Sequence, residues 1–558
     1  MDACTNKPAN VIFPKGRYDF WPDKPGATAT AFCINNARKL RLDGGGSTFV
    51  FHGLMNPFKI TRSEDVRLSD FSVDWDRPFI TQGRIAGVTD ESVDIEIDKA
   101  QYPYVIESGR AWFTGEDWKR GVDGYNILYD KTTKEIVYKT HDNPLGMDFN
   151  KRAEELKPGV VRFYGKPKIK PEIGTYIALN HGRYLVVCFE ISRCKDVILK
   201  DITVNHSLSH GVFAARTENL TLDAFNIAAN ELKGRVFSSV ADGFHLMNCK
   251  GDVVIENCAH TGLGDDFLNT HGRNCVVQKR LNDCTVRATG ADCTDVGDDV
   301  WLLRKGEAQR CEVYRVGSVK HVRVGDKWGQ EVTFSKPLPA DFKEGDFFEN
   351  KTWNATLTMR HCKILKCHRA RGILVTTPEK VVIEKNLFRT AGAAILIEGD
   401  TDFWFESGAN RNVLIRDNVF EDCLTSGCET GGRWEWGEAI ITITPSQKPD
   451  SVESEPYHRN IRIDGNTFKT FDIPIVRARS VRGLTFKNNT IEHTATYAPF
   501  AWQKAAFWFD GCREVTVRGN RYADAYGGHA IWTEHMRTED LNVKDERPFE
   551  VMERPASK

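Results

Sequence analysis

The chain has 558 residues, and its 76 lysines and arginines almost balance its 77 aspartates and glutamates, which leaves a formal net charge of −1. A chain of this length exceeds what one compact core supports, so it requires several domains or an elongated repeat fold. The balanced charge, the lack of a polybasic run and the lack of an apolar run of roughly 20 residues argue against nucleic acid or a membrane as the partner.

A short motif of the form V-x-I-x-x-N-x-F recurs along the chain. Looser copies come first, as VRLSDFSV (66–73), VILKDITV (197–204) and LTLDAFNI (220–227). Each copy combines the period-2 alternation of a short strand with a polar turn residue. The regular copies follow as VVIEKNLF (381–388), VLIRDNVF (413–420), IRIDGNTF (461–468), LTFKNNTI (484–491) and VTVRGNRY (515–522).

Repeated short strands of this kind predict a solenoid in which each coil covers the apolar edge of the preceding one. A second family of apolar segments falls between the motifs and predicts the opposite wall of the coils: HGVFA (210–214), DGFHL (242–246), RGILV (371–375), AAILI (393–397), EAIIT (438–442) and HAIWT (529–533). A large β-sandwich also has alternating strands, but it does not explain a motif that returns at least eight times. We therefore expect an all-β, right-handed parallel β-helix.

Two segments interrupt the repeat. Residues 79–183 and 285–353 carry no coil motif and read as short, charged, alternating strands joined by turns. Such segments predict small antiparallel, β-barrel-like domains inserted between coils. The expected organisation is N-terminal coils (1–78), a first inserted domain (79–183), coils that carry an acid cluster (184–284), a second inserted domain (285–353), and C-terminal coils with a tail (354–558).

Acidic residues recur at one phase of two consecutive coils, VADGFHL (240–246) and GDDFLNT (264–270). Superposing the apolar positions of the two segments aligns Asp242 with Asp266. Neighbouring parallel strands lie about 4.8 Å apart, so these two aspartates should stack, with Asp265 one residue aside on the same edge. Three carboxylates are therefore expected to converge on one small patch of the outer wall.

Stacked like charges destabilise a sheet, so a purely structural role would favour Asn or Ser at these positions. The alternatives are aspartates that cap turns and a calcium site, which needs more oxygen ligands than this segment supplies. Two carboxylates in unlike environments are what glycoside hydrolysis requires, because one donates a proton to the leaving oxygen and the other activates water or attacks the sugar. A third acid raises the pKa of its neighbour. The offset between coils predicts a gap of roughly 6.5–9.5 Å between the catalytic carboxyl groups, which admits a water molecule and is typical of hydrolysis with inversion at the anomeric carbon.

A second Asp-Asp pair, Asp298 and Asp299, lies in DCTDVGDDVW (292–301), where the coil motif has lapsed. We expect it to be a solvated loop, with metal binding as the alternative. Fifteen cysteines, among them Cys249 and Cys275, are dispersed without a Cys-x-x-Cys pair or a zinc-like spacing. They predict small buried thiols rather than a disulfide framework, and no metal or other cofactor is expected.

Several segments together resemble glycoside hydrolase family 110: FSSVADGFH (237–245), GLGDDFLNTHG (262–272), RARGILVTTPEKVVIEKN (369–386), GAAILIEGDTDFWFESG (392–408) and NVLIRDNVFEDC (412–423). The acid motifs alone are less specific, since polygalacturonases share them. The resemblance implies a β-helix with two β-barrel insertions and an exo-acting, inverting α-galactosidase that releases terminal α-1,3-linked galactose from blood-group-B-like or linear glycans. It maps the catalytic acids onto Asp242, Asp265 and Asp266. By analogy with polygalacturonases, Asp265 is the general acid and the other two activate water.

Coil phase suggests further contacts with the sugar. His245 and Asn269 should project from the wall that carries the acids, His271 lies two residues further, and Glu398 falls at the phase of His271. Arg235 could bind hydroxyls or fix a carboxylate, and tryptophans in loops could cover the apolar face of a sugar. The candidate substrate-binding residues are His245, Asn269, His271, Glu398, Arg235, Trp434 and Trp436.

Three other functions compete with this interpretation. A polygalacturonase-like hydrolase of an acidic polysaccharide should need a basic subsite, for which no convincing Arg-x-Lys is present. A β-eliminating lyase would need a Lys or Arg base and usually calcium. A non-catalytic glycan-binding adhesin has no need of three stacked acids.

The expected partner is a galactose-terminated oligosaccharide or polysaccharide, bound by a monomer or homodimer. The family implies secretion, whereas the first residues lack the basic and apolar regions of a signal peptide. We therefore expect a secreted or periplasmic protein and leave a cytoplasmic one open.

Overall fold

The computed structural model describes residues 8–290, 293–307, 310–365, 369–426, 436–500 and 504–555. Within these ranges the regular structure consists of strands and two short 3-10 turns, η2 (Glu231–Lys233) and η3 (Thr538–Asp540). None of the helical segments in the described ranges has the length and hydropathy of a membrane span.

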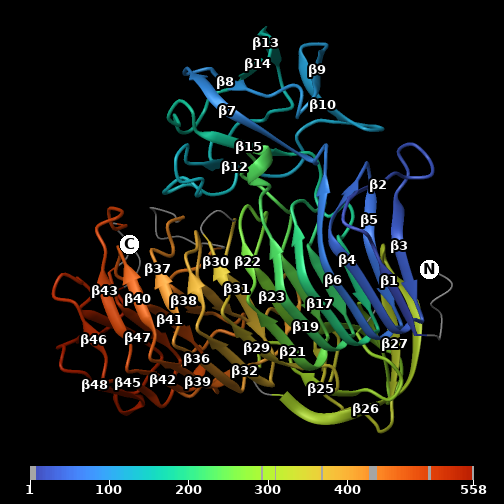
Figure 1. The fold of residues 1–558 in the computed structure, drawn as a ribbon. Coiled ribbons are helices and arrows are strands. Elements are labelled where there is room, and N and C mark those ends of the chain that lie inside the picture. Colours follow the sequence, from blue (N-terminus) through green and yellow to red (C-terminus); the bar gives the residue numbers. More distant parts are fainter. Residues whose placement is uncertain are drawn as a thin grey trace.

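The strands stack as parallel ladders along the length of the molecule, which confirms the predicted parallel β-helix (Figure 1). One ladder runs through β1 (Ala9–Ile12), β4 (Arg38–Phe51), β6 (Glu64–Trp75), β17 (Lys195–Val204), β19 (Glu218–Ile227), β21 (Lys250–Glu256), β29 (Ala355–Arg360), β32 (Lys380–Glu384), β36 (Asn412–Arg416), β39 (His458–Asp464), β42 (Val481–Lys487), β45 (Val515–Arg518) and β48 (Leu541–Lys544). Short strands continue this sheet past its turn: β2 (Arg17–Phe20), β22 (Ala259–His260), β30 (Lys363–Ile364), β33 (Leu387–Phe388), β37 (Val419–Glu421), β40 (Thr467–Thr470), β43 (Thr490–His493) and β46 (Arg521–Tyr522).

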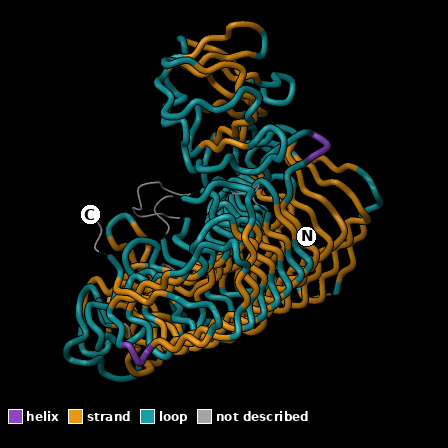
Figure 2. Tube along the Cα trace, turned by 90° about the vertical axis from the view of Figure 1, so that its left-hand side faces the viewer, coloured by secondary structure: helices purple, strands orange, loops and turns teal. Residues whose placement is uncertain are grey.

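The second ladder forms the opposite wall and carries the candidate site. It runs through β3 (Ala29–Asn35), β5 (Met55–Thr61), β16 (Phe189–Ser192), β18 (Val212–Ala215), β20 (Phe244–Met247), β23 (Leu268–Arg280), β31 (Ile373–Thr376), β34 (Ile395–Ile397), β38 (Ile441–Ile443), β41 (Val476–Arg479), β44 (Phe507–Asp510), β47 (Ala530–Glu534) and β49 (Glu550–Glu553). Viewed from the side in Figure 2, the coils form an elongated stack from which one domain projects.

Residues of equal phase stack through the coils and build the core. Phe388, Phe420 and Phe468 are fully buried, with ring centroids 5.1 and 4.7 Å apart along the stack. Cys249 and Cys258 are buried among these apolar columns, as expected for small thiols. Because the in-register strands align equal side chains, a repeating sequence buries a continuous apolar column.

The recurring asparagines of the motif form a second column at a turn. From Asn418 onward each side-chain oxygen accepts the backbone N–H of the preceding asparagine, at 2.8–3.0 Å, and each amide group in the column donates to a carbonyl of an earlier coil. The ladder consists of Asn386, Asn418, Asn466, Asn489 and Asn520, and ends on Asp545. Asparagine recurs here because one side chain satisfies both an N–H and a carbonyl of the buried turn.

The first inserted domain projects from the coil stack in both views (Figures 1 and 2). Its six-stranded antiparallel sheet has the order β12 (Asn126–Tyr129), β15 (Tyr176–Asn180), β7 (Ile80–Val88), β8 (Ser92–Glu96), β14 (Val160–Tyr164) and β13 (Ala153–Lys157). A three-stranded sheet joins β11 (Trp118–Arg120), β10 (Arg110–Gly115) and β9 (Tyr104–Glu107). The domain has an apolar cluster of its own, which also includes Trp436 from the coils.

The second inserted domain is a small barrel on the other side of the stack in Figure 1. The second half of β23 pairs with β24 (Thr285–Thr289), and pairing continues through β27 (Lys327–Phe334), β26 (Arg310–Val324), β25 (Asp299–Leu303) and β28 (Phe347–Asn350) back to β23. Its antiparallel pairing begins at Asn274, upstream of the expected start at residue 285. The expected boundary is wrong because one continuous strand, β23, serves first the coil ladder and then the barrel.

Two expectations for this barrel also need correction. Cys275 and Cys293 form a disulfide rather than separate thiols. Asp298 is not a solvated loop residue, since it is only 5% exposed and contacts the Arg216 guanidinium at 3.1 Å. It also accepts hydrogen bonds from Asn350 and other groups of the barrel. Burial among donors makes it an anchor between the barrel and the coils.

Candidate functional site

The predicted alignment of the two acidic segments is confirmed by the strand register. His245 pairs with Asn269 across β20 and β23. Just ahead of these strands, the Gly243 N–H donates to the Asp266 carbonyl at 2.8 Å. Asp242 therefore lies one coil below Asp266, on the same edge of the wall.

Glycines let the two acid-bearing turns lie against each other. A Cβ at Gly264 would meet the Val240 carbonyl oxygen at 2.1 Å, and a Cβ at Gly243 would meet the Phe267 carbonyl oxygen at 2.6 Å. Any larger residue would force the turns apart. The glycines that flank the acids in the sequence are thus required by the close approach of the backbones.

The three carboxylates converge as expected. Oxygen atoms of Asp242, Asp265 and Asp266 lie within 4.8 Å of one another. Their side chains are 9%, 20% and 2% exposed, respectively. The expected gap of roughly 6.5–9.5 Å between the acid and the base is therefore wrong for these nearest atoms, because the close-packed glycines draw the turns together, and the offset between coils is no argument for inversion.

Two arginines from the next coil bind two of these acids. Arg371 donates to Asp266 from its backbone N–H at 2.9 Å and from Nε and Nη2 at 3.0 and 2.7 Å. Arg369 Nη1 lies 2.8 Å from Asp265 Oδ2. Sequence reasoning missed both arginines, although aligning Leu268 with Ile373, as in the structure, places Arg371 over Asp266.

Charge balance sets the protonation of the cluster. Burial raises the pKa of Asp242 to about 7, although the hydrogen bond from His245 acts in the opposite direction. Burial also raises the pKa of Asp266, against the opposing charge of Arg371. Since three carboxylates face two guanidinium groups, the cluster favours binding one proton, and that proton belongs to the group as a whole.

The predicted contacts His245, Asn269 and His271 lie beside the cluster and bind one another. His245 Nδ1 is 2.7 Å from Asp242 Oδ2, and its Nε2 is 3.0 Å from His271 Nε2. Asn269 donates to Glu406 Oε1 at 3.2 Å, and the same oxygen lies 3.5 Å from His271. None of the three lines the pocket described below. They form a polar chain behind Asp242, and the hydrogen bond with the Asp242 carboxylate raises the pKa of His245 despite its burial.

Arg235 fixes a carboxylate, which is one of the two roles predicted for it, and it is too deeply buried to be the predicted substrate contact. Its side chain is fully buried, its Nη1 binds Asp74 Oδ1 at 2.7 Å, and its Nη2 donates to the Trp75 carbonyl at 2.8 Å. These residues end β6, directly before the first inserted domain. Arg235 therefore binds the segment from which that domain begins. Its position in the coil repeat did not predict the contact with the buried Asp74.

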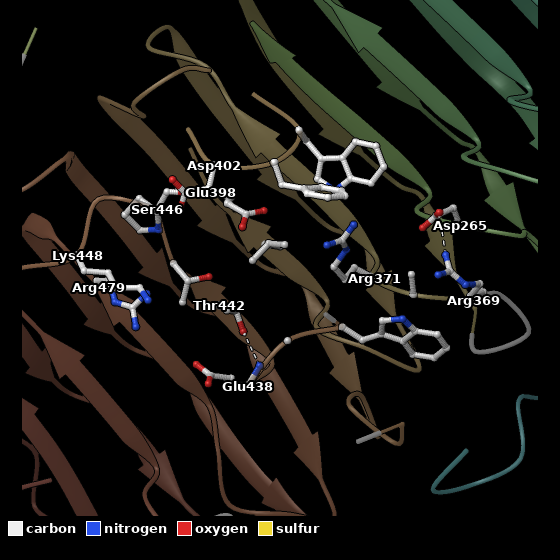
Figure 3. A pocket seen from close by; sticks show the side chains of 18 residues that line it. Asp265, Arg369, Arg371, Glu398, Asp402, Glu438, Thr442, Ser446, Lys448 and Arg479 are labelled. Atoms are coloured by element: carbon white, nitrogen blue, oxygen red, sulfur yellow. Dashed lines mark hydrogen bonds and ion pairs between the residues drawn. The ribbon is translucent and has the colours of Figure 1, made fainter. Parts of the chain in front are cut away.

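A pocket of about 590 Å³ extends from Asp265 along the coils that follow (Figure 3). Asp265 and Arg369 lie at one end, Lys448 and Arg479 at the other, and Glu398 lies between. The aromatic residues of the lining are Phe403, Trp404 and Trp436. Glu398 and Trp436 thus line the pocket, and their contact with a sugar stays a prediction, whereas Trp434 lies outside the described residues.

The pocket combines an apolar surface with polar groups. Phe403 and Trp404 are 73% and 67% exposed, which is unusual for side chains of this size. Burial raises the pKa of Glu398 to about 7, against the opposing charge of Arg371. Flat aromatic faces beside carboxyl and guanidinium groups suit a sugar, which has an apolar face and a rim of hydroxyls.

By distance alone the acid cluster could hold a cation. However, the guanidinium groups of Arg369 and Arg371 already occupy oxygens of Asp265 and Asp266, and their charge opposes a cation at this place. The residues therefore fit proton transfer better than metal binding. The expectation that no cofactor is required stays a prediction.

Known proteins match this chain over most of its length. The family model "GLAA-B beta-barrel domain I" matches residues 81–177, which coincide with the first inserted domain. Alpha-1,3-galactosidase B of Bacteroides thetaiotaomicron is 34% identical, with 98% of this chain and 91% of the relative covered. Alpha-1,3-galactosidase A of Bacteroides fragilis is 31% identical, with 97% and 92% covered. Alpha-1,3-galactosidase B of Phocaeicola vulgatus is 32% identical, with 92% and 89% covered.

Proposed function

The chain belongs to the α-1,3-galactosidase A/B family, glycoside hydrolase family 110, and from this premise we propose that it is an exo-acting, inverting α-galactosidase that releases terminal α-1,3-linked galactose. The observation that carries the proposal is the convergence of Asp242, Asp265 and Asp266 at one end of an aromatic-lined pocket. A glycan-binding protein without catalysis would have no use for three acids that repel one another.

Asp265 is the proposed general acid. It is the only one of the three acids that lines the pocket, so it can reach the glycosidic oxygen of a bound sugar. It transfers its proton to that oxygen as the bond from the oxygen to the anomeric carbon breaks. The departing sugar leaves as a neutral alcohol, and positive charge develops on the galactose ring.

Asp242 and Asp266 are the proposed pair that activates water. Arg371 holds Asp266 through a bidentate contact and opposes the effect of burial, which raises the pKa of this carboxyl. Asp242 accepts the proton of the attacking water, and His245 stabilises the charge on Asp242. The water oxygen forms the new bond to the anomeric carbon from the face opposite the leaving group, so the product is β-galactose.

The galactose ring is proposed to lie against the exposed aromatic faces of Phe403 and Trp404. Glu398 and Arg371 line the same region of the pocket and offer a carboxyl and a guanidinium group to the ring hydroxyls. Polar groups of this kind fix the orientation of a sugar, while the aromatic surface supplies the apolar contact.

The test is proton NMR of a digest of an α-1,3-linked galactose disaccharide, followed from the first minutes. β-Galactose that appears before mutarotation supports the proposal, and Asp265→Asn should release none. Initial α-galactose would contradict inversion and require one aspartate to act as a nucleophile. If no galactose is released while an acidic polysaccharide is cleaved, the polygalacturonase-like alternative holds instead.

A further inference from the structure

Arg369 connects the acid cluster with the first inserted domain. Its Nε and Nη2 donate to the two carboxylate oxygens of Asp142, each at 2.5 Å, while Nη1 contacts Asp265 at 2.8 Å. Asp142 lies in the segment between β12 and β13, so it belongs to the inserted domain. One guanidinium group thus joins a residue of that domain to the proposed general acid.

Tyr125, which directly precedes β12, makes a second connection. Its ring is buried, and its hydroxyl contacts the carbonyl oxygens of Val240 and Gly264. These carbonyls belong to the turns that carry Asp242 and Asp265. The Arg369 guanidinium also lies 4.4 Å from the centre of the Tyr125 ring, so the ring supports both the turns and the arginine.

We propose that the first inserted domain forms part of the active site, in which Asp142 and Tyr125 are positioning residues for the general acid. This inference rests on the proposed role of Asp265. Asp142 holds the guanidinium of Arg369 through a bidentate pair and leaves one N–H for Asp265. Tyr125 keeps the two acid-bearing turns at the spacing that proton transfer requires.

Asp142 affects the general acid because it shares the positive charge of Arg369 with Asp265. A lone arginine beside Asp265 would hold that residue as a carboxylate, which cannot donate a proton. Asp142 neutralises Arg369, so the net positive charge that faces Asp265 is smaller. The other charged or titratable groups that interact with Asp265 are Asp242, Asp266, Arg371, Tyr125 and Tyr184.

Asp142→Asn tests the proposal because it keeps the shape of the side chain and removes its charge. We expect kcat on the α-1,3-linked disaccharide to fall by roughly 10–100-fold with KM within about twofold, because proton donation is impaired. The alkaline limb of the pH–kcat profile should move to lower pH. An aryl α-galactoside with a 4-nitrophenolate leaving group needs little protonation, so its kcat should fall by less than about threefold.

Asp90→Asn is the matched control in the same domain. Asp90 is exposed and pairs with the exposed Lys170 at 2.6 Å, so its replacement should leave both substrates unaffected. Asp142→Glu should restore part of the disaccharide activity. Tyr125→Phe should lower kcat on both substrates, because it loosens the turns rather than changing charge.

Several results would overturn the inference. Equal losses on both substrates with an unmoved alkaline limb in Asp142→Asn would show that Asp142 only supports the fold, and unchanged kinetics would show that it has no role. A lower melting temperature with normal kcat per folded molecule would likewise reduce Asp142 to a structural residue. If the wild type hydrolyses neither galactoside, the proposed function itself fails, and that result is distinct from any behaviour of the variants.

Discussion

The chain contains two Asp-Asp dipeptides, Asp265–Asp266 and Asp298–Asp299, whose surroundings differ. Asp265 and Asp266 join a third acid from the neighbouring coil, and the cluster lies at the end of a pocket. Asp298 instead faces a single buried arginine and the amide and indole donors of the barrel, while its neighbour Asp299 pairs with the exposed Arg315. The same dipeptide is therefore chemically different in the two places.

The difference shows that what faces a carboxylate matters more than its neighbour in the chain. The Asp265–Asp266 cluster has fewer positive partners than acids, so it favours binding a proton. The carboxylate of Asp298 is bound by Arg216, Asn350 and the Trp353 indole, so it serves as a structural anchor. Three predictions test this contrast.

The largest effect is expected from the acid cluster. Replacing Asp242, Asp265 or Asp266 by Asn should each lower kcat on an α-1,3-galactoside by roughly 10²–10⁴-fold, because proton transfer is lost. The melting temperature should stay the same or rise for Asp242→Asn and Asp265→Asn, which relieve repulsion between like charges, and it should fall for Asp266→Asn, because the largely buried Arg371 loses its carboxylate partner. Steady-state kinetics with a thermal melt measure both, and a variant with near-normal kcat would remove that residue from the mechanism.

The proton of the acid cluster should make stability depend on pH. The pKa of Asp242 is raised to about 7, so the folded cluster holds a proton that the unfolded chain, with a pKa near 3.8, has lost. Its contribution to the unfolding free energy is therefore present below about pH 4 and is lost as the pH rises through 7, by an amount on the order of 2–4 kcal/mol. Asp242→Asn should flatten urea-unfolding free energies over this range. An unchanged slope would contradict the shift.

A smaller effect is expected from the structural pair. Asp298→Asn should destabilise the protein by about 2–3 kcal/mol, because Arg216 stays buried and loses one of the two carboxylates, Asp295 and Asp298, that balance its charge. Asp299→Asn removes a largely exposed ion pair and should cost less than about 0.5 kcal/mol. Both variants should keep wild-type kcat. A large loss of activity in Asp298→Asn with intact folding would contradict its assignment as an anchor.

The parts of the site that could be predicted are those set by coil phase. The strand repeat predicted the β-helix, and aligned apolar positions predicted that Asp242 stacks on Asp266. The same alignment brought His245 and Asn269 to one wall and Glu398 to the pocket. Coil phase predicts these contacts because neighbouring strands pair in register, so residues at the same position of consecutive coils become neighbours in space.

Coil phase could not predict which charges meet from distant parts of the chain. Arg235 precedes the acid-bearing segment in the chain, but its side chain binds the buried Asp74, which lies at the end of β6, directly before the first inserted domain. Likewise, Asp142 reaches Arg369 only because the inserted domain packs over the coils. Such contacts depend on the packing of segments that share no repeat.

The sequence by itself therefore determined the coils, the register of the acids and the family, because these depend on local alternation and on a motif that returns. Only the tertiary structure decided which acids are neutralised, which lie in a pocket and which anchor a domain. The physical reason is that the charge state of a carboxylate depends on burial and on the groups within a few ångströms, and folding brings those groups from remote segments.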